Sequence, residues 1–344
     1  MAHRDSQMQD FLILGGEMRP DVCPESEWQH FQKGVVVKVD ADTLTAERIY
    51  DYQSPPEVCP DLPSVVFKAG TLVEDRLYAC TQTEVFVYRL PDFTVEHYFS
   101  LPFFNDLHHV MPSGRDTLLV VVTGLDLVVE VDLNGELVNE WCVLGDDTWQ
   151  RFSKDTDYRK VPSTKPHQAH PNLVFTLGDE VWATRCDLKD AVSLTQPGRR
   201  IDLSGDGAHQ VAHVHDGFQL DDSLYFTSVD GNVITVDIDS LQVINIVNLQ
   251  EIVKTEYPLG WCRGIKVLDH SRIIIGFSRL RQTKLQDKVS WAKAQVKRVT
   301  GIGDYRETLP EMPTRICCFN IEKGEQEWEL PLDDVRMDAV FSVL

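Results

Sequence analysis

The sequence predicts an all-β fold, a six-bladed β-propeller, and three observations lead to it. Runs of β-branched and aromatic residues bounded by Asp, Asn, Gly and Pro occur throughout the chain, such as GVVVKVDADT, EVFVYRLPDF and NVITVDIDSL. These runs recur in groups of four with a period of about forty residues. The last seven residues, DAVFSVL, are a further strand-like run with nothing after it.

The clearest four-strand unit runs from His215 to Leu249. Its strands read HDGFQL, LYFTSV, VITVDI and VINIVNL, and Asp-Asp and Asp-Gly-Asn supply the turns after the first and second strands. Similar units begin at Ser64, Leu107, Ala169 and Cys262, and the last of them is interrupted before its third strand. Four antiparallel strands per unit at this period are typical of propeller blades.

The sixth blade is expected to combine both ends of the chain. FLILGGEM, GVVVKVDAD and TAERIYDYQ near the N-terminus supply three strands, and DAVFSVL supplies the missing inner strand. Joining them removes the exposed sheet edges and closes the ring. We therefore predict a single propeller domain over residues 1–344, closed by the C-terminal strand.

Two insertions interrupt the period, at about 145–168 and 280–313. The second is basic, and its middle, LQDKVSWAKAQVKRV, favours an amphipathic helix. One interpretation is a solvated face over a small apolar cluster. The other is a lid over one mouth of the channel that helps to hold an anionic ligand.

The charge of the chain narrows the range of partners. A formal net charge of -21 argues against nucleic acid and anionic membranes. The N-terminus is polar, and no apolar run is long enough to span a bilayer, so we expect a cytoplasmic protein. The oligomeric state stays open.

The inner strands of the repeat carry the candidate site. Aligning the units on their second strands, with a tolerance of one or two residues, places six residues at the channel: Phe67, His109, His170, His215, Arg263 and Asp338. Three imidazoles from different blades would then converge on one axis, which is the arrangement that a metal ion requires. The alternative is a metal-free polar channel filled with water.

Neighbouring histidines leave the choice of ligands open. Residues two apart on a strand share a face, so His213 is expected to accompany His215, whereas His108 and His109 point to opposite faces. Either His167 or His170 could be the ligand at the third position. Asp106, Asp216 and Asp338 are candidates for carboxylates that orient the rings.

Arg263 and Asp338 are the predicted catalytic residues. They occupy adjacent positions in the closed ring, so they either pair with each other or leave Arg263 to bind a substrate carboxylate or phosphate. The expected cofactor is a divalent metal bound by His109, His170, His215 and His213, with Fe(II) slightly preferred over Zn or Mn. No GxSxG, HExxH, P-loop or Rossmann motif occurs in the sequence.

One stretch resembles known propellers. LHHVMPSGRDTLLVVVTGLDLVVEVDLNGELVNEW is similar to a blade of the arylsulfotransferase-like and NHL-type six-bladed propellers, through its His, Pro-x-Gly, Val-x-Glu-Val-Asp, Gly-Glu-Leu-Val and Glu-Trp elements. A ring of inner-strand histidines is also similar to the iron site of the larger, seven-bladed carotenoid-cleaving oxygenases. Both resemblances imply a fold, and neither implies an activity, because propellers host many functions.

The predicted function is that of a metal-dependent enzyme acting on a small polar or anionic substrate, as an Fe(II) oxygenase, a lyase or a hydrolase. Three histidine ligands leave metal positions open for water or substrate. The alternative is a non-catalytic propeller that binds a partner protein or a small metabolite.

Overall fold

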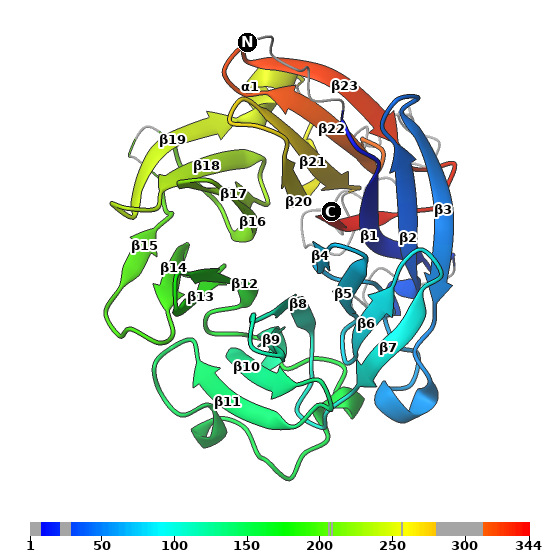
Figure 1. Ribbon diagram of the computed structural model, residues 1–344, viewed down its shortest axis with the longest axis vertical. Coiled ribbons are helices and arrows are strands. Elements are labelled where there is room, and N and C mark those ends of the chain that lie inside the picture. The colour runs from blue at the N-terminus through cyan, green and yellow to red at the C-terminus, as the bar shows by residue number, and fades with distance from the viewer. Residues whose placement is uncertain (1–7, 21–28, 206, 208, 256, 280–311) are drawn as a thin grey trace, which may run out of the picture.

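A computed structural model describes residues 8–20, 29–205, 207, 209–255, 257–279 and 312–344. Within these residues the strands form six four-stranded antiparallel sheets, which are arranged as blades around a central axis (Figure 1). The predicted six-bladed β-propeller is therefore confirmed.

Five blades are each built from consecutive strands, taken here from the inner to the outer strand. The first contains β4 (Thr71–Val73), β5 (Arg76–Cys80), β6 (Val85–Arg89) and β7 (Thr94–Phe99). The second contains β8 (Leu107–Pro112), β9 (Thr117–Val122), β10 (Leu127–Asp132) and β11 (Leu137–Cys142). The third contains β12 (Pro171–Leu177), β13 (Glu180–Arg185), β14 (Asp190–Ser193) and β15 (Arg200–Asp202). The fourth contains β16 (Val214–Leu220), β17 (Ser223–Ser228), β18 (Asn232–Asp237) and β19 (Gln242–Asn248). The fifth contains β20 (Trp261–Val267), β21 (Arg272–Ser278), β22 (Arg315–Asn320) and β23 (Glu325–Pro331).

The sixth blade joins the two ends of the chain, as predicted. Its order is β24 (Ala339–Val343), β1 (Phe11–Met18), β2 (Phe31–Asp40) and β3 (Thr45–Tyr52). Leu12 and Leu344 exchange backbone hydrogen bonds of 3.0 and 2.8 Å. At Gly15 the two backbones come so close that a Cβ atom would lie 1.8 Å from the carbonyl oxygen of Ala339. The closing strand thus depends on a residue without a side chain.

Neighbouring blades cover both faces of each sheet, which explains the composition of the middle strands. In β9, TLLVVV, and β10, LVVEVD, nearly every residue is buried. A strand that is buried on both faces needs a continuous apolar run rather than an alternating one. The outer strands face solvent, and β11, LVNEWC, is mostly exposed.

Two adjacent cysteines of β22 illustrate this burial and give a testable expectation. Cys317 and Cys318 point to opposite faces of the strand and pack in different apolar clusters. Burial raises the pKa of each thiol to about 12. Near pH 8 we expect iodoacetamide to leave both unmodified in the folded protein, because only the thiolate reacts.

The check is intact-mass spectrometry across a pH series, with half-buried Cys142 as the internal comparison. Below the pKa the thiolate fraction rises about tenfold per pH unit, so alkylation of Cys317 and Cys318 should accelerate as pH rises. Both should react readily in denaturant at the starting pH. Rapid modification of either residue in the folded protein would contradict the burial described above.

Of the two predicted insertions, the structure describes the first but almost none of the second. The first contains the short 3-10 helices η4 (Thr148–Gln150) and η5 (Tyr158–Lys160), and the Tyr158 N–H donates to the carbonyl of Pro102. The second, including the expected lid, lies almost entirely outside the described residues. No helix in the described part of the chain is long and apolar enough to cross a membrane.

Candidate functional site

Six side chains, one from each blade, gather near the beginnings of the inner strands. They are Lys68, His108, His170, His215, Arg263 and Phe341. Five of them line a small cavity of about 60 Å³, together with Asp106 and Lys165. His215 reaches the same group through its ring contacts with His108 and Phe341.

The contacts among these side chains are close. The ring centroid of His108 lies 5.3 Å from that of His170 and 5.8 Å from that of His215. Lys68 Nζ and Arg263 Cζ lie 4.7 and 4.5 Å from the centroid of the Phe341 ring. Cations at this distance from an aromatic ring are attracted by its negative face. The six residues therefore form one connected cluster, which we call the histidine cluster.

The structure places three of the predicted channel residues in this cluster. His170, His215 and Arg263 are members, whereas Lys68 and His108 replace the predicted Phe67 and His109, one position away. Phe341 occupies the position expected for Asp338. The histidine cluster is thus made by the predicted blades, with a different register in three of them.

Irregular strand pairing explains the shift at His109. Both Leu107 and His109 pair with successive residues of β9, Val122 and Val121, so His108 is an extra residue between them. A β-bulge of this kind re-aims side chains that strict alternation would place on the other face. The pairings of β12, β16 and β20 have similar shifts near His170, His215 and Arg263.

His109 is engaged elsewhere. Its Nδ1 accepts a hydrogen bond of 3.4 Å from the Val174 N–H, and its Nε2 lies 3.4 Å from Thr71 Oγ1. Because the Thr71 hydroxyl donates to the Val110 carbonyl, Nε2 of His109 must be the donor. Burial lowers the pKa of His109 to about 4. Both ring nitrogens of this predicted metal ligand are therefore already occupied.

His108 and His215 each donate from Nδ1. His108 Nδ1 lies 2.8 Å from the backbone oxygen of Asp106, and His215 Nδ1 lies 2.9 Å from Asp216 Oδ2. Burial lowers the pKa of His215, and that of His108 well below its usual value, so both rings are neutral near pH 7. A neutral ring that donates from Nδ1 carries a lone pair on Nε2. Nε2 of His215 is buried and has no hydrogen-bond partner among the described residues.

His170 has the same tautomer, by a longer chain of contacts. Thr164 Oγ1 lies 2.5 Å from the Gly124 carbonyl oxygen and must donate to an acceptor, so it accepts from His167 Nε2 at 3.3 Å. Nδ1 of His167 then accepts from Nδ1 of His170, at 3.2 Å. Burial lowers the pKa of His170 well below its usual value. Three neutral imidazoles of the cluster, those of His108, His170 and His215, thus carry an unprotonated (bare) Nε2 atom with a lone pair.

Asp126 holds the segment that carries His170. Its carboxylate accepts hydrogen bonds from the backbone N–H groups of Gln168, Ala169 and His170, at 3.0, 3.1 and 2.8 Å. Arg151 Nη1 adds a bond of 2.9 Å. His170 itself has a φ of 55°, a conformation that a non-glycine residue adopts only when its surroundings hold it. Asp126 is therefore the anchor of this ligand candidate, and no spacing in the sequence indicates it.

Positive charge accompanies the histidines. Lys68 Nζ lies 3.1 Å from Asp106 Oδ1, and both side chains are buried. Burial alone would raise the pKa of Asp106, but nearby Lys68 and the histidines bring it well below its usual value. Arg263 and Lys165 also line the cavity. Among the described residues that line the cavity, three are cationic and one is a carboxylate, although the chain as a whole is acidic.

Asp338 and His213 lie outside the cluster. The Asp338 carboxylate accepts the Met18 N–H at 2.8 Å and so takes part in the closure of the ring. His213 Nδ1 lies 3.2 Å from Asp187 Oδ1, and the two belong with Cys186 to a group whose possible metal-ligand atoms are all within 4.8 Å. Among the described residues no other group meets this limit, so the three bare Nε2 atoms of the histidine cluster are not all that close together.

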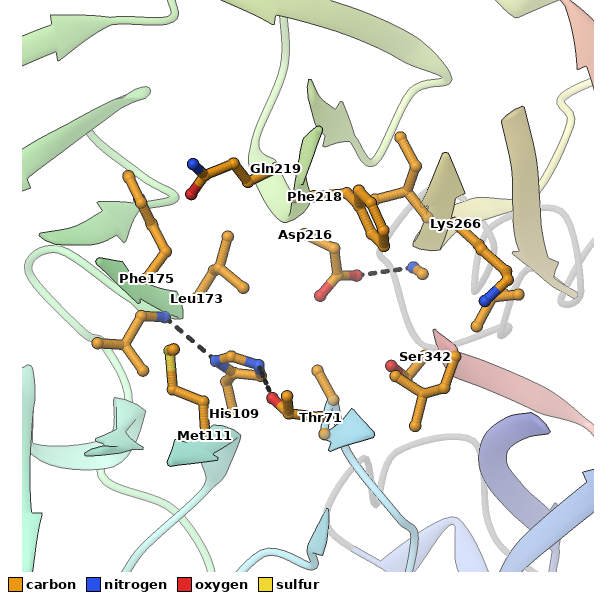
Figure 2. A pocket seen from close by; sticks show the side chains of 18 of the residues that line it. Thr71, His109, Met111, Leu173, Phe175, Asp216, Phe218, Gln219, Lys266 and Ser342 are labelled. Carbon is orange, nitrogen blue, oxygen red and sulfur yellow. Dashed lines mark hydrogen bonds between the residues drawn. The ribbon is translucent and has the colours of Figure 1, made fainter. Parts of the chain in front are cut away.

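A second, wider cavity of about 370 Å³ lies farther along the same inner strands (Figure 2). Each inner strand that gives one residue to the histidine cluster gives the following residues to this cavity. The successions include His108 to His109, His215 to Asp216, and Arg263 to Gly264 through Lys266. We call it the apolar cavity, because Leu, Val, Ile, Met and Phe side chains dominate its wall.

Comparison with known proteins supports the fold. No protein-family model matches the chain, and no curated protein matches it. A crystal structure of a protein of unknown function from Bacteroides caccae is similar, with a TM-score of 0.58, 13% identity and 98% coverage of both chains. At this identity the likeness shows the fold alone. A chain of a mitotic checkpoint complex structure gives a TM-score of 0.48 at 8% identity, covering 99% of this chain and 86% of the other.

Proposed function

We propose that this propeller is a metal-dependent enzyme that acts on a small anionic substrate. The carrying observation is the shared tautomer of His108, His170 and His215, each of which donates from Nδ1 and keeps a lone pair on Nε2. Histidines that bind metals in proteins almost always donate their other ring N–H to a carboxylate, a carbonyl or a comparable acceptor. Three such rings from separate blades suit a divalent metal, with Fe(II) slightly preferred over Zn and Mn.

The ring separations support this ligand set. Two imidazoles that share one metal, with metal–nitrogen distances of about 2.0–2.1 Å, have centroids roughly 5–6 Å apart. The His108–His170 and His108–His215 separations of 5.3 and 5.8 Å lie in that range. Binding would require the Nε2 atoms to turn toward a common point, since they do not all lie within 4.8 Å of one another.

The cationic residues then select the substrate. Lys68 forms an ion pair with Asp106, and Arg263 and Lys165 line the wall of the same cavity. An anionic group bound between the metal and these side chains would be held by charge-assisted hydrogen bonds. The metal would supply Lewis acidity, water activation or oxygen binding, which leaves oxygenase, lyase and hydrolase chemistry as the reaction classes.

Metal analysis of the protein purified without oxygen tests this proposal. We expect about one Fe or Zn per chain, and Co²⁺ titration of the metal-free protein should give the visible spectrum of a histidine-ligated ion. Changing His108, His170 or His215 to alanine should each lower the affinity by at least about a hundredfold, because a ligand is lost directly. His109→Ala is the matched control and should retain the metal.

Two results would contradict the proposal. Wild-type protein that binds neither Fe²⁺, Zn²⁺ nor Co²⁺ would favour the non-catalytic alternative. The second is loss of metal in His213→Ala together with retention of metal in the three cluster variants. This result would assign the metal to Cys186, Asp187 and His213 instead.

A further inference from the structure

The apolar cavity is lined by the buried carboxylate of Asp216, in which only one of the two oxygens accepts hydrogen bonds from described residues. Asp216 is 4% exposed, and its Oδ2 accepts hydrogen bonds from His215 Nδ1 and the Gly264 N–H, at 2.9 and 2.8 Å. Its Oδ1 has no hydrogen-bond partner among the described residues. Figure 2 shows this carboxylate at the cavity, with one oxygen in a drawn hydrogen bond and the other oxygen outside it. Because Asp216 lines the cavity, this oxygen is available to accept a hydrogen bond from a bound ligand.

The same cavity contains a lysine that has no counterion among the described residues. Lys266 lines the wall on β20, and no hydrogen bond or ion pair joins it to any described residue. In Figure 2 it lies on the side of the cavity opposite Leu173 and Phe175. The cavity therefore offers one negative group, Asp216, and one positive group, Lys266, and each can form a further hydrogen bond or ion pair with a ligand.

The remaining wall is suited to an apolar body. Leu173, Phe175 and Phe218 face the cavity together with Met111 on β8. A volume of about 370 Å³ is within the range of small-molecule sites, which hold drug-sized ligands. An apolar surface of this size with a few polar groups is the usual composition of a specific ligand site.

We propose that the apolar cavity binds a zwitterionic small molecule with an apolar body, such as an amino acid with a large apolar side chain. Its ammonium group would bind Asp216, its carboxylate would bind Lys266, and its side chain would pack on Leu173 and the neighbouring aromatic rings. A simple amine would be repelled by the positive charge of Lys266, and a simple acid would be repelled by the negative charge of Asp216. Only a ligand with both groups satisfies both residues. This site lies beside the proposed metal centre and shares with it the hydrogen bond between Asp216 and His215.

Calorimetric titration of the full-length protein with three matched probes tests the inference. L-phenylalanine carries both charges, phenethylamine lacks the carboxylate, and 3-phenylpropionate lacks the ammonium group. We expect L-phenylalanine to bind most tightly, with each incomplete probe weaker by about tenfold or more, since each loses a charge-assisted hydrogen bond. L-leucine and L-tryptophan extend the panel to other apolar side chains.

Two variants assign the charged groups. Lys266→Met should weaken L-phenylalanine about tenfold without weakening phenethylamine, and Asp216→Asn should weaken L-phenylalanine without weakening 3-phenylpropionate. Lys38→Met, on the exposed surface, is the control and should change nothing. Because Asp216 also orients His215, Lys266→Met is the cleaner variant.

The inference is overturned if none of the amino acids binds, if 3-phenylpropionate or phenethylamine binds wild type as tightly as L-phenylalanine, or if neither variant changes the order of the probes. It is separable from the metal proposal. His108→Ala should lose metal and keep L-phenylalanine binding, whereas Lys266→Met should keep metal. Failure of one binding event therefore leaves the other still measurable.

Discussion

Replacing Gly15 with alanine is expected to lower the free energy of unfolding by more than about 3 kcal/mol, among the largest effects of a single substitution. The new Cβ atom would lie 1.8 Å from the oxygen and 2.9 Å from the carbon of the Ala339 carbonyl. Both are backbone atoms of the closing strand β24, so relief requires β1 and β24 to separate. Since this pairing closes the ring, its loss exposes edges in the sixth blade.

Denaturant unfolding of Gly15→Ala beside Gly16→Ala measures the effect. At Gly16 the nearest atom to a new Cβ is a methyl carbon of Val66, at 2.7 Å, and the backbone oxygen of Lys33 is at 3.0 Å. The closest obstacle is thus a side chain, which can move more cheaply than a paired backbone. The Gly16 variant should therefore lose clearly less stability. Equal losses in both variants would mean that the close approach of β1 and β24 is not what limits substitution at Gly15.

Asp126→Ala is expected to cost about 3–5 kcal/mol and to abolish high-affinity metal binding. The carboxylate is 1% exposed and serves three backbone N–H groups as well as Arg151. Removing a buried charged acceptor leaves several donors without partners, which is strongly destabilising. His170 would at the same time lose the anchor that keeps its backbone at a φ of 55°.

Arg151→Met is the matched variant for this prediction. Arg151 is 21% exposed and supplies only one of the four hydrogen bonds to Asp126 described above, so we expect a smaller loss of stability and retained metal binding. The readouts are denaturant unfolding and the Co²⁺ titration. If Arg151→Met behaves like Asp126→Ala, the ion pair rather than the backbone contacts positions His170.

The fold was predictable because its signals are local and repeated. Four strands at a regular period, with Asp, Asn and Gly at the turns, identify each blade without knowledge of its neighbours. The closing strand was predictable for a related reason, since DAVFSVL is a strand without a blade and the N-terminal unit is a blade without an inner strand. The pairing of β24 with β1 confirms this reasoning.

For the candidate site, the sequence allowed us to predict which blades contribute side chains, but not which residue each blade contributes. His170 and His215 were assigned to the channel, but the choice of His109 over His108 assumed strict alternation along β8, and the bulge between Leu107 and His109 breaks it. Bulges depend on the register of the partner strand, which a single sequence does not reveal. The metal itself and the reaction stay predictions.

Other parts of the site depend on contacts between distant segments. Asp126 binds the backbone of residues more than forty positions away, and Asp216 accepts from Gly264 on the next blade. Neither contact has a local pattern that would mark it. A useful signal was the local excess of histidines between residues 108 and 215, which pointed to the region of the histidine cluster although not to every ring in it.

The pairing of β24 with β1 also has a consequence for how the protein is made. The hydrogen-bonding partner of residues 11–18, at residues 339–343, is synthesised more than three hundred residues after them. During this part of translation β1 lacks the strand that pairs with its inner edge in the native sheet. The nascent chain is therefore most vulnerable to wrong strand addition at β1, and a chaperone that shields this edge would raise the yield of native protein.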